Sequence, residues 1–231
     1  MSEGKEGGQN LGTRTYWEQR YEKEYKREVN PWFLKFMEKH KKEIGPEVLD
    51  IGCGAGRNLL PLAKEGYRVT GIDFIEKALE DVKEKLDKEG LEANLVLGDS
   101  HNLPIDNEKM DTVVSHQSFQ FNDWQGAEEC FAEATRVLKP GGLFYLRVRS
   151  DKRALPEKYE RLDDKGITIR EERNGNIITY HHYSLEEIKE LADKNGLEII
   201  ENPVDARDIK EDGEIERGQW NVVLRKKEIK P

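Results

Sequence analysis

The sequence contains few of the features that mark secreted, metal-binding or membrane proteins. Only two of its 231 residues are cysteines, and Cys53 and Cys130 lie too far apart to form a CxxC pair or a disulfide framework. No apolar run approaches the roughly 18 residues that a membrane-spanning helix requires. The N-terminal MSEGKEGGQN has no apolar signal-peptide core. We therefore expect a cytoplasmic protein in a reducing environment, with no metal centre and no membrane association.

Apolar residues are also scarce, whereas charge is abundant. Hydrophobic residues make up 35% of the chain and charged residues 37%, and 38 Lys and Arg stand against 47 Asp and Glu, a formal net charge of −9. The apolar residues are nevertheless gathered in short dense runs, which is typical of a folded core beneath a very polar surface. The length suits one domain, predicted over residues 13–231 behind a disordered tail of residues 1–12. The acidic balance disfavours sequence-independent binding of nucleic acid or anionic membranes.

Short strand-like runs alternate with amphipathic helix-like runs along most of the chain. This alternation predicts an α/β fold with a mostly parallel sheet and helices on both faces. Two late strands are expected to pair in antiparallel fashion, so that the sheet has seven strands and an antiparallel last strand. The predicted strands are residues 47–52, 67–73, 93–99, 110–117, 143–149, 197–204 and 219–227, and the predicted helices are residues 57–65, 75–90, 126–138 and 185–195, the last begun by a capping box of Ser184 and Glu187.

Two segments depart from this alternation. Before the first strand, the run YWEQRYEKEY predicts a polar helix with aromatic residues about four apart, and Asn30-Pro31 predicts the N-cap and first residue of a second helix. After the fifth strand, residues 151–183 contain two β-rich runs around Asn174-Gly175, a strong signal for a type I′ hairpin. Because insertions at this point project at the ligand-binding edge of such a sheet, we expect the hairpin to face the substrate.

The most distinctive local feature is VLDIGCGAGR, in which a buried strand runs into alternating glycines and then into a helix. Glycine lets the backbone turn tightly and approach a ligand, and the start of the helix offers unpaired N–H groups. The dinucleotide fingerprint GxGxxG would need a third glycine at the position of Arg57, which disfavours a nicotinamide dehydrogenase. Asp50, two residues before Gly52, would repel a pyrophosphate but could meet a cationic amino group. A purely structural tight turn is the alternative.

Acidic residues stand at the ends of successive predicted strands. Asp73 ends the second strand, where a carboxylate can accept hydrogen bonds from both hydroxyls of a ribose, although it could also serve as the N-cap of the next helix. Asp99 ends the third strand, where it can accept from the exocyclic amine of adenine, although Asp is also an ordinary turn residue. Acids at three strand ends beside a glycine loop together indicate a ligand-binding edge of the sheet.

These segments together resemble the class I S-adenosylmethionine-dependent methyltransferases, particularly the small-domain group called type 11. VLDIGCGAGRNLLPLAKEGYRVTGIDF looks like the glycine motif and following acid of that family, and GDSHNLPI like its adenine-contact segment. DTVVSHQSFQF resembles its fourth-strand motif, and VLKPGGLFYL resembles the helix, turn and strand that follow. The resemblance covers about residues 45–150 and implies a Rossmann-like sheet with S-adenosylmethionine as cofactor and S-adenosylhomocysteine as product.

The same resemblance implies a set of cofactor-binding residues. Asp50 and the glycine-loop backbone would lie around the methionine moiety, Asp73 would bind the ribose hydroxyls, and Phe74 and Asp99 would contact the adenine. A lid helix within residues 13–44 would close over the cofactor. The residues so implied are Asp50, Gly52, Cys53, Gly54, Gly56, Asp73, Phe74, Asp99, Ser100 and His116, with Tyr16 and Arg20 from the lid.

We therefore predict methyl transfer from S-adenosylmethionine to a small-molecule acceptor. The alternatives are a tRNA or protein acceptor, or a non-catalytic module that binds S-adenosylmethionine. If the acceptor must lose a proton, His116, His181 and His182 are the candidate bases, and the last two point to opposite faces of one strand. Arg147 and Arg149 share one face of the fifth strand. We expect them to pair with acids beneath the hairpin, the alternative being contact with an anionic acceptor.

Overall fold

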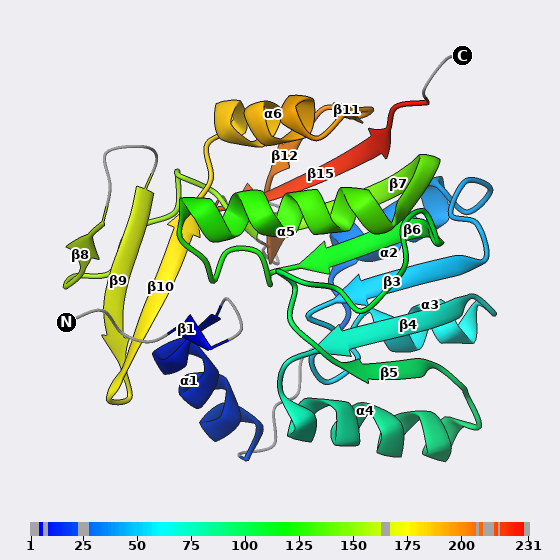
Figure 1. Cartoon of the computed structure of the whole chain (residues 1–231), viewed down its shortest axis with the longest axis horizontal. Helices are drawn as coiled ribbons and strands as arrows, with labels where there is room; N and C mark the ends of the chain where they lie inside the picture. The colour runs from blue at the N-terminus through cyan, green and yellow to red at the C-terminus, as the bar shows by residue number, and fades with distance from the viewer. Residues whose placement is uncertain are drawn as a thin grey trace.

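The computed structural model describes residues 5–6, 9–22, 28–162, 167–206, 208–209, 215–216 and 218–228. Its main sheet has the spatial order β11-β15-β7-β6-β3-β4-β5 (Figure 1). The five strands from β7 to β5 run parallel, and β15 pairs with β7 in antiparallel fashion. The strands are β3 (Glu47–Ile51), β4 (Arg68–Asp73), β5 (Asn94–Leu97), β6 (Met110–His116), β7 (Leu138–Arg149), β11 (Leu197–Ile199) and β15 (Gln219–Lys226), with β12 (Val204–Asp205) also paired to β15.

This arrangement confirms the predicted seven-stranded, Rossmann-like sheet with its antiparallel last strand. The carboxyl ends of β3, β4 and β5 lie at one edge of the sheet because these strands pair in parallel register. The strand predicted over residues 197–204 is interrupted, since β11 and β12 pair separately with β15.

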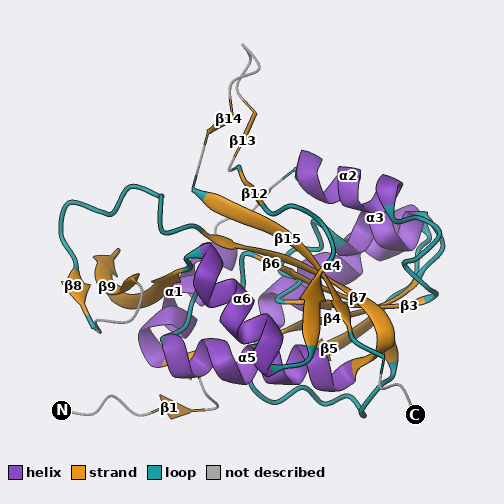
Figure 2. Cartoon of the chain, turned by 90° about the horizontal axis from the view of Figure 1, so that it is seen from above, coloured by secondary structure: helices purple, strands orange, loops and turns teal. Residues whose placement is uncertain are grey.

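Helices cover both faces of the sheet, and Figure 2 shows α5 and α6 on one side with α2 and α3 on the other. The apolar stripes of α5 and α6 supply Phe131, Ile188 and Leu191 to one buried cluster, and those of α2 and α3 supply Phe33 and Leu62 to another. Each helix buries one apolar face, as its amphipathic sequence predicts. The helices are α2 (Pro31–Lys39), α3 (Leu59–Lys64), α4 (Glu76–Glu89), α5 (Trp124–Val137) and α6 (Leu185–Lys194). None of the helices in the described ranges is long and apolar enough to cross a membrane.

The insertion after β7 forms a separate small sheet, β10-β9-β8. β9 (Ile167–Arg173) and β10 (Asn176–His182) pair in antiparallel register, and β8 (Glu160–Arg161) pairs with β9. The turn residues Asn174 and Gly175 have φ values of 51° and 75°, as a two-residue type I′ turn requires, so the predicted hairpin is confirmed. Helix α1 (Leu11–Tyr21) lies between this sheet and the main body (Figure 1).

Local capping signals were good guides to helix boundaries. The Asn30 side chain accepts a hydrogen bond from the Trp32 N–H at 2.9 Å, and the capping box of Ser184 and Glu187 is present in both directions. Gly90 ends α4 in the left-handed region.

The N-terminal segment differs from its prediction in two respects. α1 begins at Leu11, preceded by a short antiparallel pair, β1 (Lys5–Glu6) and β2 (Gln9–Asn10), within the range predicted as a tail. α2 packs its buried Phe33 and Phe36 rings against Tyr145 of the main sheet, with centroids 5.5 and 4.8 Å away. Most of α2 therefore belongs to the core rather than to a lid, because its apolar stripe is satisfied by the sheet.

Candidate functional site

The glycine loop between β3 and α3 has a backbone that other residues would adopt only with strain. Gly52, Gly54 and Gly56 have φ values of 68°, 54° and 81°, all in the left-handed region. A Cβ on Gly54 would lie 2.5 Å from the Tyr21 hydroxyl, and one on Gly52 would lie 2.5 Å from the Cβ of Ser118. The loop is thus enclosed by α1 and by the residues after β6, and its missing side chains leave backbone facing a cavity.

That cavity, here called the cofactor cavity, has a volume of about 820 Å³ and lies at the carboxyl ends of the parallel strands. It brings together residues from four predicted motifs that are far apart in the sequence. The predicted site residues that line it are Gly52, Cys53, Gly54, Asp73, Phe74, Ser100 and His116. Asp50, Gly56, Asp99, Tyr16 and Arg20 are not among its described lining residues.

Asp50 lies directly beneath the glycine loop and is fully buried. Neither of its carboxylate oxygens accepts a hydrogen bond of good geometry from the part of the chain that the structure describes. Burial raises the pKa of Asp50 to about 7, with the Arg57 guanidinium opposing the shift and the neighbouring Asp73 adding to it. The site therefore holds a carboxylate whose charge is poorly compensated, which favours a cationic group of a ligand.

Asp73 organises the loop in addition to lining the cavity. One carboxylate oxygen accepts the Gly54 N–H at 2.8 Å, and the other accepts the Ile75 N–H at 3.0 Å, at the start of α4. Burial raises the pKa of Asp73 to about 6, against the stabilising effect of the backbone hydrogen bonds from Ile75, Gly54 and Phe74. Asp73 thus has a structural role in the loop as well as a place in the cavity wall, but the N-cap of α4 is Ile75, so the alternative of Asp73 as N-cap is wrong.

Asp99 is directed towards a histidine that the sequence analysis did not single out. Its Oδ1 accepts the His101 backbone N–H at 2.9 Å and contacts His101 Nδ1 at 2.5 Å, while His101 Nε2 meets Asn122 at 2.9 Å. Although burial opposes it, the Asp99 hydrogen bond helps to raise the pKa of His101 to about 10. The turn after β5 is held by this pair, and its neighbours Gly98 and Ser100 reach the cofactor cavity.

Two further predicted residues are packed tightly at the cavity wall. His116 ends β6, with its ring centroid 6.4 Å from Phe33 and 6.2 Å from Tyr145. Cys53 is buried, and burial together with Asp73 and Asp50 raises the pKa of its thiol well above the ordinary value. Cys53 is therefore a protonated packing residue rather than a nucleophile.

The sequence analysis did not assign the aromatic residues of the cofactor cavity wall to the site. Trp17 and Tyr21 of α1 and Phe121 line it, and the Trp17 and Phe121 rings meet edge to face with centroids 5.2 Å apart. The predicted Tyr16 instead packs against Tyr180 of the hairpin sheet, and Arg20 lies over the Tyr16 ring at 5.8 Å. The four-residue spacing of Trp17 and Tyr21 was the available signal.

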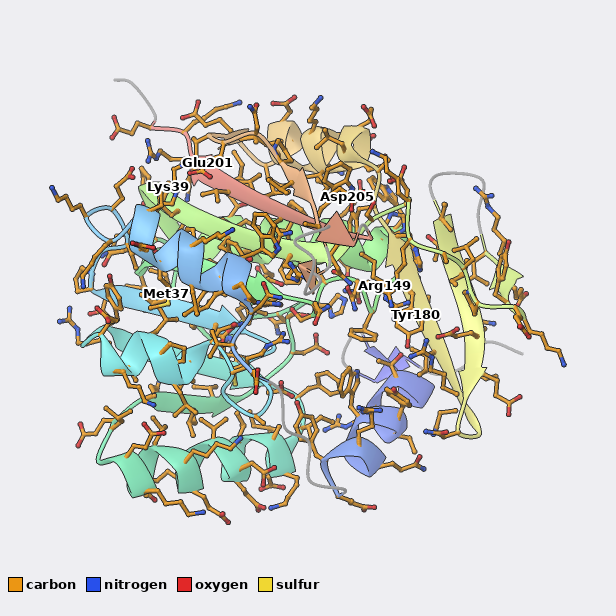
Figure 3. The ribbon with its side chains drawn as sticks, turned by 180° about the vertical axis from the view of Figure 1, so that it is seen from behind. Met37, Lys39, Arg149, Tyr180, Glu201 and Asp205 are labelled. Atoms are coloured by element: carbon orange, nitrogen blue, oxygen red, sulfur yellow. The ribbon has the colours of Figure 1, made fainter. Side chains whose placement is uncertain are left out.

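A second cavity of about 440 Å³, here called the arginine cavity, adjoins the first. The two share Trp17, Glu28, Val29, Arg57, Gln117 and Phe121 as lining residues. Its other walls come from α1, β7 and β10, and in Figure 3 Arg149 of β7 and Tyr180 of β10 are labelled beside each other. The hairpin insertion thus contributes to a space next to the cofactor cavity.

The structure corrects two expectations about this region. Arg149 forms no ion pair with an acid of any described residue; its guanidinium lies 3.7 Å from the Tyr180 ring centroid instead. The described contacts of Arg147 include hydrogen bonds donated to the Asn221 side chain and the Ala206 carbonyl, and the expected pairing with an acid is corrected for Arg149 alone. His181 and His182 are fully buried and line neither cavity. Burial, with Arg149 adding to it, lowers the pKa of His182 to about 3.

The cofactor cavity suits the group that the resemblance implies. Its volume suits a nucleoside-sized ligand, Asp73 lines it, and the buried Asp50 immediately precedes the glycine loop that forms part of its wall. Within the described ranges, no three His, Cys, Asp or Glu side chains are placed to hold a metal ion.

Comparisons with known proteins agree with this geometry. A family model described as a methyltransferase domain matches residues 48–142. The chain is 33% identical over 118 residues to a demethylmenaquinone methyltransferase of Lactobacillus johnsonii, covering 49% of this chain and 48% of that protein. It is 29% identical over 212 residues to a tRNA N(3)-methylcytidine methyltransferase of Schizosaccharomyces pombe, covering 83% and 66%.

Solved structures share the fold at low sequence identity. The 1,6-didemethyltoxoflavin-N1-methyltransferase of Burkholderia thailandensis superposes with a TM-score of 0.69 at 17% identity, over 94% of this chain and 88% of that one. The chain spans about half to two-thirds of the length of the two curated relatives named above. Its sheet order and glycine loop are those of the class I S-adenosylmethionine-dependent methyltransferase fold, and residues 48–142 match the methyltransferase domain family.

Proposed function

We propose that this protein transfers a methyl group from S-adenosylmethionine to a small-molecule acceptor and releases S-adenosylhomocysteine. The observation that carries the proposal is the junction of the two cavities. The cofactor cavity and the arginine cavity share walls at Trp17, Arg57, Gln117 and Phe121, so a donor in one and an acceptor in the other would be in contact. The second cavity is of the size that a small molecule fills.

The chemistry asks for little beyond positioning. S-adenosylmethionine carries its methyl group on a sulfonium centre, which is already an activated electrophile. The protein's contribution is to hold the acceptor atom in line with that methyl group and to exclude water, which α1 favours by covering the glycine loop. If the acceptor is a hydroxyl or an ammonium, a base must take its proton. His116 is the proposed base, because it is the one of the three candidate histidines that lines a cavity.

The proposed cofactor contacts are those that the family resemblance implies, of which Asp73, Phe74 and Ser100 line the cofactor cavity. Asp50 would face the methionine ammonium, Asp73 the ribose hydroxyls and Phe74 the adenine, with Asp99 near the adenine amine through the turn that carries Ser100. Tyr16 and Arg20 are proposed to act indirectly, since they brace α1 against the hairpin sheet. Trp17 and Tyr21 join the proposed set because they line the cavity.

A tRNA acceptor is the second candidate, favoured by the relative in Schizosaccharomyces pombe. The formal charge of −9 and the limited volume of the second cavity, about 440 Å³, support the small-molecule acceptor over it. A non-catalytic S-adenosylmethionine-binding module would use the same residues but would release no S-adenosylhomocysteine.

The first test titrates the protein with S-adenosylmethionine and, in parallel, with NAD while the midpoint of thermal unfolding is recorded. A rise with S-adenosylmethionine is expected, and a rise with NAD alone would contradict the proposal. The second test measures S-adenosylhomocysteine release over a metabolite panel and over unmodified tRNA. Release with a metabolite supports the proposal, release with tRNA alone supports the second candidate, and binding without any release supports the non-catalytic module.

A further inference from the structure

The arginine cavity concentrates positive charge in a protein whose net charge is negative. Five arginines line it, Arg57, Arg147, Arg149, Arg153 and Arg173, and Glu28 is the one acid among its described lining residues. Glutamine side chains and the Tyr16 and Tyr180 rings complete the wall. A cationic pocket of this size is suited to a small anion.

Arg149 is the best-defined charge in this cavity. Arg149 is only 7% exposed, yet its Nε has no hydrogen-bond partner and its guanidinium contacts no carboxylate within the described part of the chain. Desolvating a charge without a partner costs several kcal/mol in proteins. Such a cost is expected at a position where a ligand supplies the missing charge.

Arg149 lines the arginine cavity, and no carboxylate of the described residues pairs with its guanidinium. Its guanidinium stacks on the Tyr180 ring at 3.7 Å, and its backbone N–H is held by Gln120 Oε1 at 3.1 Å. Glu171, the neighbouring acid, is already paired with Arg173. A stacked guanidinium presents its N–H groups in the plane of the fork, the arrangement that binds a carboxylate or phosphate through two parallel hydrogen bonds.

Resting on the methyl transfer proposed above, we infer that the acceptor is a small organic anion whose carboxylate or phosphate group is bound by Arg149 in the arginine cavity. Arg153 and Arg173 supply further positive charge around that group. The shared walls at Gln117 and Phe121 would place the rest of the acceptor beside the cofactor cavity.

The electrostatics of the cluster agree with this assignment. Burial lowers the pKa of Arg149 to about 10; Tyr180 and Glu171 oppose the shift, and Arg153 and Arg173 add to it. Arg149 therefore remains charged at neutral pH while its neighbours repel it. A bound anion would relieve both the repulsion and the lack of a partner.

The binding test uses the full chain at constant ionic strength, with and without saturating S-adenosylhomocysteine. The probes are benzoate, phenyl phosphate and, as the neutral match, benzamide. Their binding is measured by thermal unfolding and by calorimetry. Benzoate or phenyl phosphate should raise the midpoint of thermal unfolding, and benzamide should not. The anion that binds more tightly shows whether the acceptor carries a carboxylate or a phosphate. Arg149→Met should weaken anion binding at least tenfold and leave S-adenosylhomocysteine affinity within twofold.

Two further variants make the result specific. Arg149→Lys keeps the charge but not the planar fork, so it should bind the anion with intermediate affinity. Arg68→Met is the matched control, because Arg68 is exposed, paired with Glu47 and remote from both cavities, and it should leave anion binding unchanged. Equal anion affinity in wild type and Arg149→Met, or no stabilisation by either anion, would overturn the inference.

Turnover separates this inference from the proposed function. With 3,4-dihydroxybenzoate and 3,4-dihydroxybenzamide as matched acceptors, Arg149→Met should raise KM for the carboxylate at least tenfold and change kcat much less. Methyl transfer to neutral acceptors alone would overturn the inference of an anionic acceptor but would support the proposed methyltransferase activity. Anion binding that depends on Arg149, in a protein that neither binds nor consumes S-adenosylmethionine, would overturn the proposed function instead.

Discussion

At the residue scale, two buried carboxylates carry a charge that is unfavourable without a ligand: Asp73, which lines the cofactor cavity, and Asp50, which precedes its glycine loop. Asp50 has no good hydrogen-bond donor among the described residues, whereas Asp73 has two backbone donors, and burial raises the pKa of both. A protein that needed only stability would place neutral side chains there. The two acids therefore carry distinct expectations for mutation.

Asp50→Asn should stabilise the unliganded protein and weaken its cofactor binding. The amide removes a buried charge, so the free energy of unfolding at pH 8 should rise by about 2 kcal/mol, while affinity for S-adenosylmethionine falls at least tenfold. Urea unfolding and calorimetry measure the two effects. Asp111→Asn is the contrasting control. The Asp111 carboxylate accepts hydrogen bonds from the Glu47 N–H and from Lys139, so replacing it with an amide should destabilise the folded protein. A destabilised Asp50→Asn would refute this account.

Asp73→Ala should weaken the binding of S-adenosylmethionine by about 1–3 kcal/mol, the usual cost of losing hydrogen bonds to a charged group. It should also lower stability, because the Gly54 and Ile75 N–H groups lose their acceptor. Asp73→Asn keeps one oxygen acceptor, so its affinity for S-adenosylmethionine and its stability should lie between those of the wild type and those of Asp73→Ala. Calorimetric titration decides the point, and an unchanged affinity for Asp73→Ala would remove the ribose assignment.

At the scale of elements, helix α1 joins the two cavities. Tyr16 packs against the hairpin sheet, while Trp17 and Tyr21, on the adjacent face, line the cofactor cavity. The hairpin strand β10 in turn supplies Tyr180 to the arginine cavity. Closure over the cofactor and the shape of the second cavity therefore depend on the same packing.

The Asn174-Gly175 turn offers a clean test of hairpin stability. Gly175 has φ 75° and a Cβ there would meet nothing within 4 Å, so Gly175→Ala should cost only backbone strain, about 1 kcal/mol. Gly175→Asn should cost less, because Asn adopts this conformation more readily. Chemical denaturation measures both. Equal stability of the alanine variant and the wild type would show that the turn is not in the left-handed region.

At the scale of the whole molecule, charge is divided between an acidic exterior and a cationic cavity. The net charge is −9, but five arginines line the arginine cavity, next to the cofactor cavity that Asp73 lines and whose glycine loop follows the buried Asp50. The pKa values of Asp50, about 7, and Asp73, about 6, lie above those of exposed carboxyls. These two carboxyls therefore hold more protons in the folded chain than in the unfolded chain between about pH 4 and pH 7.

This linkage gives stability and binding opposite pH dependences. The stability that Asp50 and Asp73 contribute to the unliganded protein should fall as pH rises through that window, because their protonated forms are favoured in the folded state, whereas the lowered pKa of His182 acts in the opposite direction. Affinity for the cationic S-adenosylmethionine should rise about tenfold from pH 5.5 to pH 7.5, with proton release on binding. Calorimetry in buffers of different ionisation enthalpy measures the number of protons released on binding. Asp50→Asn should flatten the dependence of S-adenosylmethionine affinity on pH. A pH-independent affinity in the wild type would contradict the linkage.

Much of the fold follows from short-range patterns. The alternating strands, the Asn30 cap, the Ser184–Glu187 capping box and the Asn174-Gly175 turn each depend on residues within a few positions of one another, so they were predictable. The side chains of α1 were not. Tyr16 and Trp17 are adjacent in the sequence, and their roles depend on how the helix is rotated against the hairpin sheet and Phe121.

By itself, the sequence determined the α/β class, the mostly parallel sheet with its antiparallel last strand, the glycine loop and the acids at the strand ends, because parallel strands bring their carboxyl ends to one edge whatever the packing details. Only the tertiary structure decided which charges have partners. Asp99 contacts His101, Arg149 stacks on Tyr180 instead of pairing with an acid, and His181 and His182 are buried away from both cavities. Such contacts join residues of separate elements, and pairing or burial of a side chain is a property of the packed neighbours rather than of its own segment.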